Sequence, residues 1–259
     1  MNEGIRIPAA KSLRIFAVAA ALLVAWGFSG AASADMISIE IEAMSAGEAS
    51  KFVWTVPEVL DAGGRMTWSL PGPLVLMGST GVIGTVDAMT VGFDADPGVS
   101  LSFALTAGAS DTTFTSSSSI VSFSPIAGPT AYASAGTTVT DTNSNGASLT
   151  GLYAGGKAYK FMYNSPSVDW AYLVNSSAAG ADMTSVTNDR MPATGRVVIP
   201  ASIFQIQSQY HFTVSAFDQV SGTSYFYIGE PVPEPGTMML MGTAALMMTG
   251  VVIRRRMKN

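Results

Sequence analysis

Acid–base chemistry has few candidate residues in this chain of 259 residues, because it contains one histidine and no cysteine. A Ser-His-Asp hydrolase would have to use His211 as its base, and zinc or copper sites need several His or Cys ligands. His211 lies in a run that alternates apolar and polar residues, on the polar side. No G-x-S-x-G turn precedes a helical pattern. We therefore expect His211 to be an exposed strand residue, and we expect no catalytic residue.

Paired carboxylates are another route to hydrolysis, since a glycosidase needs only two of them. Most candidates lie in turn-like contexts, where Asp accepts hydrogen bonds from nearby backbone N–H groups. They are Asp87, Asp94, Asp96, Asp111, Asp141, Asp169 and Asp218. No pair stands out among them, so a glycosidase or lyase is the weakest of the functions that these residues leave open.

Asp141, Asn143 and Asn145 precede Gly146 and match the first half of the D-x-[DN]-x-[DN]-G calcium loop. In such a loop, oxygens at alternate positions surround the cation, and the glycine permits a sharp turn. The twelfth position is Leu152 instead of a bidentate Glu, and no helical pattern flanks the loop. We therefore favour an Asn-Gly hairpin, and calcium is the one cofactor left open.

Aromatic side chains could stack on sugar rings, because the C–H-rich face of a sugar fits a π-face. The candidates are Tyr153, Tyr159, Tyr163, Trp170, Tyr172, Tyr225 and Tyr227. Two rows would share a strand face, namely Tyr159 with Phe161 and Tyr163, and Trp170 with Tyr172. Because aromatic residues usually fill cores, we expect these rows in the core and keep a carbohydrate-binding surface as the alternative.

Strands must position these residues, because apolar and polar residues alternate with period two from Met36 onward. Three apolar faces are Ile37, Ile39 and Ile41; Met89, Val91 and Phe93; and Val99, Leu101, Phe103 and Leu105. The longest run places Phe204, Ile206, Ser208, Tyr210, Phe212, Val214 and Ala216 on one face. Further strands are expected over 52–56, 66–70, 112–123, 137–140, 147–153, 158–163, 170–174, 196–199 and 225–228.

About a dozen short strands joined by turns predict an all-β fold of two packed antiparallel sheets, a β-sandwich of jelly-roll or Ig-like order. Residues 57–84 are rich in Gly and Pro, and residues 176–194 are polar without periodicity, so we expect both to be long loops. Neither stretch separates two independent cores. We therefore expect one β-sandwich domain over residues 35–230.

The charge of this body excludes several classes of protein. With no cysteine there is no disulfide scaffold, and 12% charged with 48% hydrophobic residues argues against charge-driven disorder. From Asp35 to Pro235, six Lys and Arg stand against seventeen Asp and Glu, a net charge of −11. Basic side chains are absent between Arg65 and Lys157. A basic face for phosphate groups is therefore lacking, and we expect no nucleic-acid partner.

The N-terminus has the pattern of a secretory signal peptide, with three basic residues up to Arg14, an apolar run over 15–28 and the small-residue site Ala32-Ser33-Ala34. As a helix the run would measure about 21 Å, short of the roughly 30 Å hydrocarbon core of a bilayer. We therefore predict that residues 1–34 form a signal helix that signal peptidase removes after Ala34, with Ala32 and Ala34 as its recognition residues.

The C-terminus has the pattern of a membrane anchor, because the uncharged residues 236–253 are just long enough to span a bilayer. The basic tail 254–259 would lie in the cytoplasm and leave the body outside. Its charges are Arg254, Arg255, Arg256 and Lys258. The box Val232, Pro233, Glu234 and Pro235 precedes the apolar stretch. This pattern alone fits a permanent anchor and a removable one equally well.

The order of a Val-Pro-Glu-Pro box, a short apolar helix and an arginine cluster resembles the PEP-CTERM sorting signal of Gram-negative bacteria, here over residues 231–259. The resemblance implies that an exosortase, a membrane-embedded cysteine transpeptidase, processes the chain near Pro233, Glu234 and Pro235. It also implies a transient inner-membrane anchor, then transfer to the cell surface or extracellular polysaccharide matrix. We therefore expect a secreted, non-catalytic structural or adhesive protein, with extracellular polysaccharide as a partner. A carbohydrate-binding module is the alternative.

Overall fold

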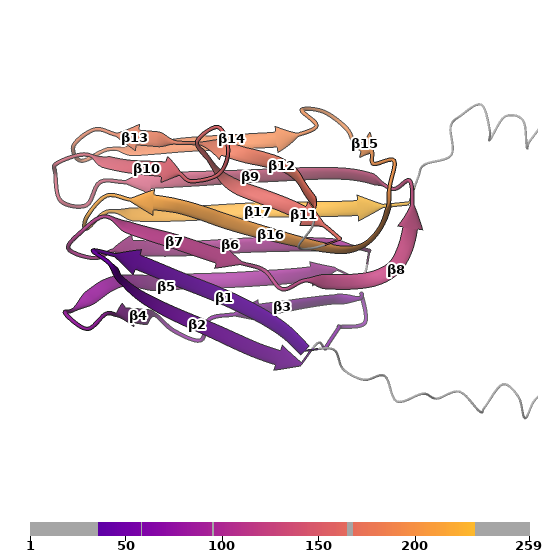
Figure 1. Cartoon of the computed structure of the whole chain (residues 1–259), viewed down its shortest axis with the longest axis horizontal. Helices are drawn as coiled ribbons and strands as arrows, with labels where there is room; N and C mark the ends of the chain where they lie inside the picture. The colour runs from indigo at the N-terminus through magenta and orange to yellow at the C-terminus, as the bar shows by residue number, and fades with distance from the viewer. Residues whose placement is uncertain (1–35, 58, 95, 165–167, 231–259) are drawn as a thin grey trace, which may run out of the picture. The chain divides into compact units, whose positions relative to one another are not determined.

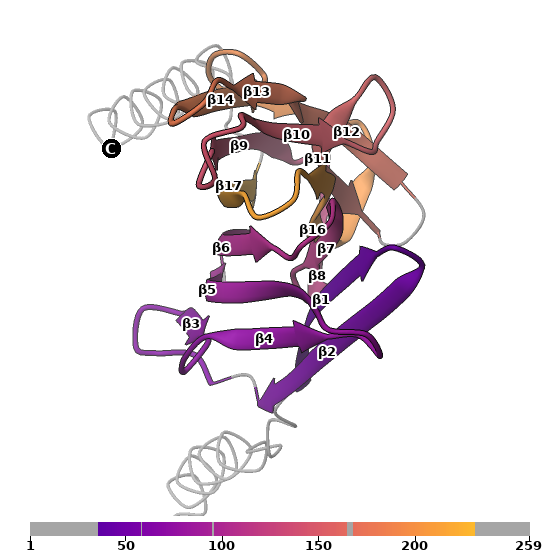
Figure 2. The ribbon, with the colours of Figure 1, turned by 90° about the vertical axis from the view of Figure 1, so that its left-hand side faces the viewer.

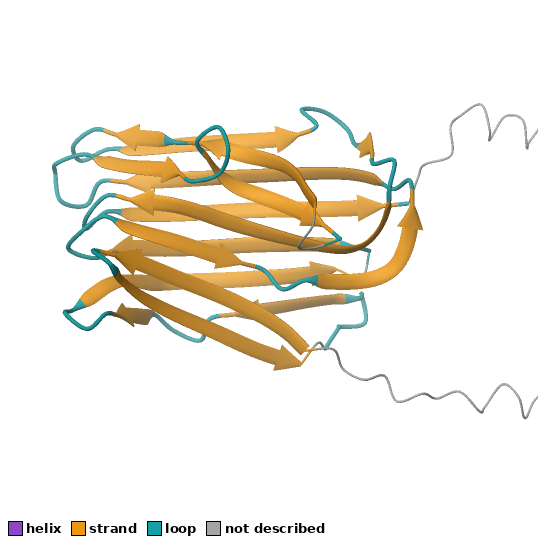
Figure 3. Ribbon diagram, in the orientation of Figure 1, coloured by secondary structure: helices purple, strands orange, loops and turns teal. Residues whose placement is uncertain are grey.

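The computed structural model of the chain describes residues 36–57, 59–94, 96–164 and 168–230. They fold into two antiparallel β-sheets, and the described residues contain no helix (Figure 1 and Figure 3). The predicted all-β sandwich is confirmed. The helices predicted for residues 1–34 and 236–253 lie outside the described residues.

The first sheet, called sheet A, has the order β12-β11-β16-β7-β1-β2. In addition, β8 pairs with the beginning of β16, β10 pairs with its end, and β13 pairs with β10. The strands of sheet A are β1 (Met36–Ser45), β2 (Glu48–Pro57), β7 (Thr112–Ser117), β8 (Val121–Ala127), β10 (Ala147–Gly151), β11 (Lys157–Tyr163), β12 (Val168–Asn175), β13 (Ser177–Ala179) and β16 (Ser202–Val214).

The second sheet, called sheet B, has the order β14-β9-β17-β6-β5-β3, with β15 paired to β9 and β4 paired to β5. Figure 2 looks along the strands and shows the two sheets as separate layers. The strands of sheet B are β3 (Arg65–Ser69), β4 (Leu74–Met77), β5 (Val82–Asp94), β6 (Gly98–Ala107), β9 (Thr130–Thr140), β14 (Thr184–Met191), β15 (Val197–Val198) and β17 (Gln219–Gly229).

The core lies between the sheets and holds the apolar faces that alternation predicts. The three predicted faces on β1, β5 and β6 are all buried. The inward residues of β9 are small and include Ala131, Ala133 and Ala135. Tyr210 spans the whole interior, and its hydroxyl donates to the backbone oxygens of Thr223 at 2.6 Å and Gly136 at 3.2 Å.

The predicted face of β16 is right from Ile206 to Val214 and wrong at Phe204, which is 42% exposed. The pairing of β16 with β8 shifts register between Ile203 and Gln205. Over this shift β16 advances by two residues and β8 by four. The inward alternation of β16 is interrupted at this irregularity, and Ile203 is buried in place of Phe204.

Three predictions about segment boundaries are also wrong. The single strand expected over 112–123 is divided into β7 and β8, and the buried Ser118 and Ser119 lie between them. The loops expected over 57–84 and 176–194 contain β4, β13, β14 and the start of β5, besides β3, which matches the strand expected over 66–70. An edge strand such as β14 buries neither side fully, so its sequence carries no apolar period.

Candidate functional site

The predicted calcium loop joins β9 of sheet B to β10 of sheet A, so the expectation of a hairpin is wrong. One Asp141 oxygen accepts the N–H of Asp182 at 2.6 Å and the other accepts the N–H of Asn143 at 3.3 Å. Burial would raise the pKa of Asp141, but these backbone N–H groups outweigh burial and hold it below its ordinary value. The Asn143 oxygen likewise accepts the N–H of Asn145.

The side-chain oxygens of Asp141 and Asn143 thus stabilise the turn itself, as Asp and Asn commonly do. No cluster of three or more His, Asp or Glu side chains in the described part of the chain is arranged to hold a metal ion. Of the other candidate carboxylates, Asp87 accepts from Thr106 and Asp111 accepts the N–H of Ala216. Asp218 is fully buried and accepts the N–H of Thr142, the residue after Asp141.

His211 lies half-buried on the outer face of sheet A, where its ring and that of Tyr153 make a T-shaped contact with centroids 5.5 Å apart. Burial lowers its pKa, Glu42 opposes that change, and Lys160 adds to it. Around it, Tyr153 donates to Gln209 at 2.6 Å. Asp169 accepts from Tyr172 at 2.7 Å and from Lys160 at 3.3 Å. Tyr153 and Gln209 are therefore paired with each other, and Lys160 and Tyr172 share Asp169.

Of the two aromatic rows predicted from the sequence, one lies in the core and the other is not formed. Tyr159 and Phe161 are fully buried. Phe161 stacks on Phe226 of the opposite sheet at 4.8 Å, and Trp170 lies against the same Phe226 ring at 5.6 Å. Tyr163 is half-buried. The expectation that Trp170 and Tyr172 share a face is wrong, because the pairing of β11 with β12 shifts register next to Trp170. Tyr172 is opposite Lys160 and lies 5.8 Å from the Tyr153 ring, on the outer face of sheet A.

A different aromatic group lies on the outer face of sheet B. Tyr225 and Tyr227 are successive outward residues of β17, and Tyr227 is directly opposite Tyr132 of β9. Centroids of Tyr132 lie 5.7 Å from both Tyr225 and Tyr227, and the three rings are half-buried. Partial burial raises the pKa of Tyr225, with smaller effects of Tyr132 and Asp94 in the same direction, so its hydroxyl stays protonated and able to donate.

Two exposed arginines stand over these rings. Arg190 of β14 lies 5.1 Å from the Tyr132 centroid, since β14 pairs with β9 at this level. Arg196 precedes β15, which also pairs with β9, and lies 4.3 Å from the Tyr227 centroid and 5.8 Å from that of Tyr132. We call Tyr132, Tyr225, Tyr227, Arg190 and Arg196 the tyrosine–arginine face.

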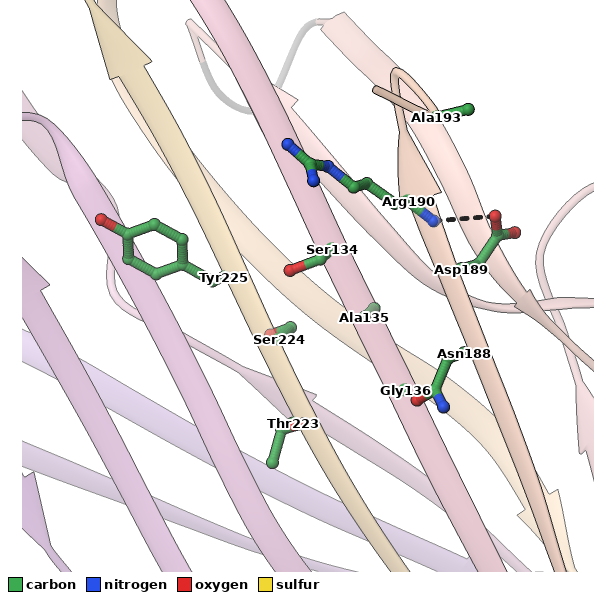
Figure 4. Close-up of a pocket in the computed structure, with 10 residues that line it drawn as sticks. All are labelled: Ser134, Ala135, Gly136, Asn188, Asp189, Arg190, Ala193, Thr223, Ser224 and Tyr225. Carbon is green, nitrogen blue, oxygen red and sulfur yellow. Dashed lines mark hydrogen bonds between the residues drawn. The ribbon is translucent and has the colours of Figure 1, made fainter. Parts of the chain in front are cut away.

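An open groove of about 610 Å³ runs beside this face, across β17, β9 and β14. Figure 4 shows Arg190 reaching from β14 over Ser134, with Asn188, Gly136 and Thr223 along the groove. A side chain at Gly136 would overlap the Asn188 amide. Because Gly136 has no side chain, the Asn188 amide can lie directly over the backbone at this point of the groove. A smaller hollow of about 220 Å³ lies on the other side of Tyr225.

Sequence reasoning included Tyr225 and Tyr227 but missed Tyr132, Arg190 and Arg196. The stretch from Thr130 to Gly136 was not foreseen as strand, because its inward residues are alanines and give no strong apolar alternation. The alternation that predicts a strand is nevertheless present in this stretch, because alanines alternate with Tyr132 and Ser134. The arginines could not be assigned to Tyr132 without knowing which strands flank β9.

The remaining predicted site residues lie outside the described residues. They are Ala32 and Ala34; Val232, Pro233, Glu234 and Pro235; and Arg254, Arg255, Arg256 and Lys258. Within the described ranges, the structure contains no helix with the length and apolarity needed to cross a membrane.

One family model matches the C-terminal end of the chain. Residues 231–256 match the family model of the PEP-CTERM protein-sorting motif. A comparison of the chain with curated proteins finds no match. The motif indicates a secreted protein that an exosortase sorts, with a C-terminal tail that anchors it transiently in the membrane before processing. The chain therefore carries a PEP-CTERM protein-sorting motif at residues 231–256.

Proposed function

We propose that the mature protein is a non-catalytic adhesive component of the cell envelope or extracellular matrix, and that it holds polysaccharide through the tyrosine–arginine face. One observation supports this above the others. Three half-buried tyrosines gather on an outer sheet face beside an open groove, whereas Tyr159 and Phe161 are fully buried in the core.

The chemistry of the groove suits a sugar chain. A sugar presents a C–H-rich face that packs on an aromatic ring and a rim of hydroxyls that need hydrogen-bond partners. Tyr225 supplies a ring with no cation over it among the described residues. The side chains of Ser134, Asn188 and Thr223 in the groove supply both donors and acceptors.

Binding to insoluble and soluble polysaccharides tests the proposal with the exported protein recovered from the extracellular fraction. Tyr225→Ala removes the stacking ring, and we expect a five- to thirty-fold loss of affinity, the usual range for a central aromatic contact. Tyr172→Ala is the matched control, because Tyr172 is also half-buried but belongs to sheet A. Equal affinities for the original protein and Tyr225→Ala would contradict the proposal.

The sorting part of the proposal has its own measurement, the intact mass of the endogenous protein from membranes and from the matrix. We expect a matrix form that begins at Asp35 and ends near Pro233 to Pro235, after cleavage by signal peptidase and exosortase. A matrix form that retains Arg254 to Asn259 would contradict removal of the tail.

A further inference from the structure

The charges of the body single out two arginines. Six Lys and Arg occur between residues 36 and 230. Four of them form ion pairs, Lys51 with Glu40, Arg65 with Asp94, Lys157 with Asp189 and Lys160 with Asp169, at 2.8 to 3.3 Å. Within the described ranges, Arg190 and Arg196 are in ion-pair distance of no carboxylate, and both stand over Tyr132.

The tyrosines hold these two guanidinium groups in place. A guanidinium over a ring face is attracted by the ring and keeps its in-plane N–H donors available. Of its five donors, Arg190 uses one for the backbone oxygen of Gly195, at 3.1 Å. The two arginine side chains therefore lose little further conformational entropy when a ligand binds. Two oriented donor groups remain without an acidic partner in an acidic protein.

We propose that the tyrosine–arginine face binds an acidic polysaccharide, in which Arg190 and Arg196 receive sugar carboxylates while a neighbouring ring stacks on Tyr225. This inference rests on the proposed function and adds the class of polysaccharide. Guanidinium and carboxylate are both planar and pair through two parallel hydrogen bonds. The groove beside Arg190 offers uncharged partners for hydroxyls, namely Ser134, Asn188 and Thr223.

The same charges disfavour a nucleic acid as the ligand. Double-stranded DNA has one charge about every 1.7 Å, and its binding needs many phosphate contacts. Two cations on a body of net charge −11 cannot supply them. A polysaccharide with one carboxylate for each acidic sugar demands fewer cations and leaves its neutral hydroxyls for the groove.

Polygalacturonate and alginate, each compared with its own carboxyl-reduced form, test this inference on the exported protein. We expect at least tenfold tighter binding to the acidic polymers, and an affinity that falls as salt is raised. Arg190→Gln with Arg196→Gln should remove the preference for the acidic form. Arg196→Lys should give an intermediate result, because it keeps the charge and loses the planar pairing.

Lys51→Gln is the control for charge, since Lys51 is also exposed but is paired with Glu40 on sheet A. Urea midpoints of all variants establish that they fold. Equal binding of acidic and reduced polymers would overturn the inference and leave the proposed function standing. Binding of none of the polymers would overturn both. Equally strong competition by single-stranded DNA would overturn the inference, because it would indicate a general affinity for polyanions.

Discussion

His211 carries the chain's single imidazole and lies half-buried beside Tyr153. Burial lowers its pKa in the folded protein; Glu42 acts against this shift and Lys160 adds to it. The unfolded chain then binds the proton more tightly, so stability is lost as the pH falls below about 6.5 and through the folded-state pKa. We expect the one imidazole signal in the NMR spectrum to titrate below pH 6.5.

His211→Gln is the control for stability, because carboxylates also lose stabilising interactions in acid and do so in both proteins. Between pH 7.5 and pH 5, the urea midpoint should fall further in the original protein than in His211→Gln. A signal that titrates at or above pH 6.5 would contradict this account.

Gly222 of β17 lies directly opposite Phe103 of β6, and a Cβ atom at Gly222 would overlap the Phe103 ring. That ring cannot easily move, because it packs on Tyr210 at 4.8 Å and on Phe212 at 5.7 Å. We expect Gly222→Val to lower the free energy of unfolding by about 1–3 kcal/mol, the usual cost of an overpacked core, as measured by urea unfolding. Ser221→Val, one residue away and pointing outward, should change it by less.

At the scale of elements, Trp54 of β2 and Trp68 of β3 join the edge strands of the two sheets, with ring centroids 5.1 Å apart. Such an aromatic pair contributes about 0.5–1.5 kcal/mol beyond the area it buries. A double-mutant cycle of Trp54→Ala and Trp68→Ala should give a coupling of that size. The cycle of Trp54→Ala with Trp170→Ala is the control, since Trp170 packs on Phe226 instead. A coupling of similar size in this control would contradict a specific interaction between Trp54 and Trp68.

How far the sequence predicts an element depends on what its inward side contains. The inward faces of β5 and β6 were predictable because large apolar residues, such as Phe93 in β5 and Leu101 in β6, recur at every second position. Strand β14 was not predictable, because its residues are exposed or half-exposed on both sides. The candidate site depends on register, since Arg190 and Tyr132 are far apart in the chain and meet because Arg190 is opposite Ser134. No single segment contains that information.

At the scale of the whole molecule, the two sheets supply each other's core from residues between Ile37 and Ile228. We therefore expect a chain of residues 35–230 to unfold in one cooperative urea transition, because neither sheet keeps a core without the other. Its midpoint should match that of the exported protein. Loss of the transition, or a second transition, would show that the ends contribute to folding.

The position of β17 determines how the body responds to force. β17 ends at Gly229 and the sorting motif begins at residue 231, so the transient tail continues almost directly from this strand. β17 is hydrogen-bonded on both sides, to β9 over Gln219–Gly229 and to β6 over Gln219–Tyr227. The bonds of an antiparallel ladder run across the strand direction. Tension transmitted through the tail along β17 would therefore load both ladders together in shear instead of opening them one bond at a time, which makes the tether point a mechanically resistant part of the fold.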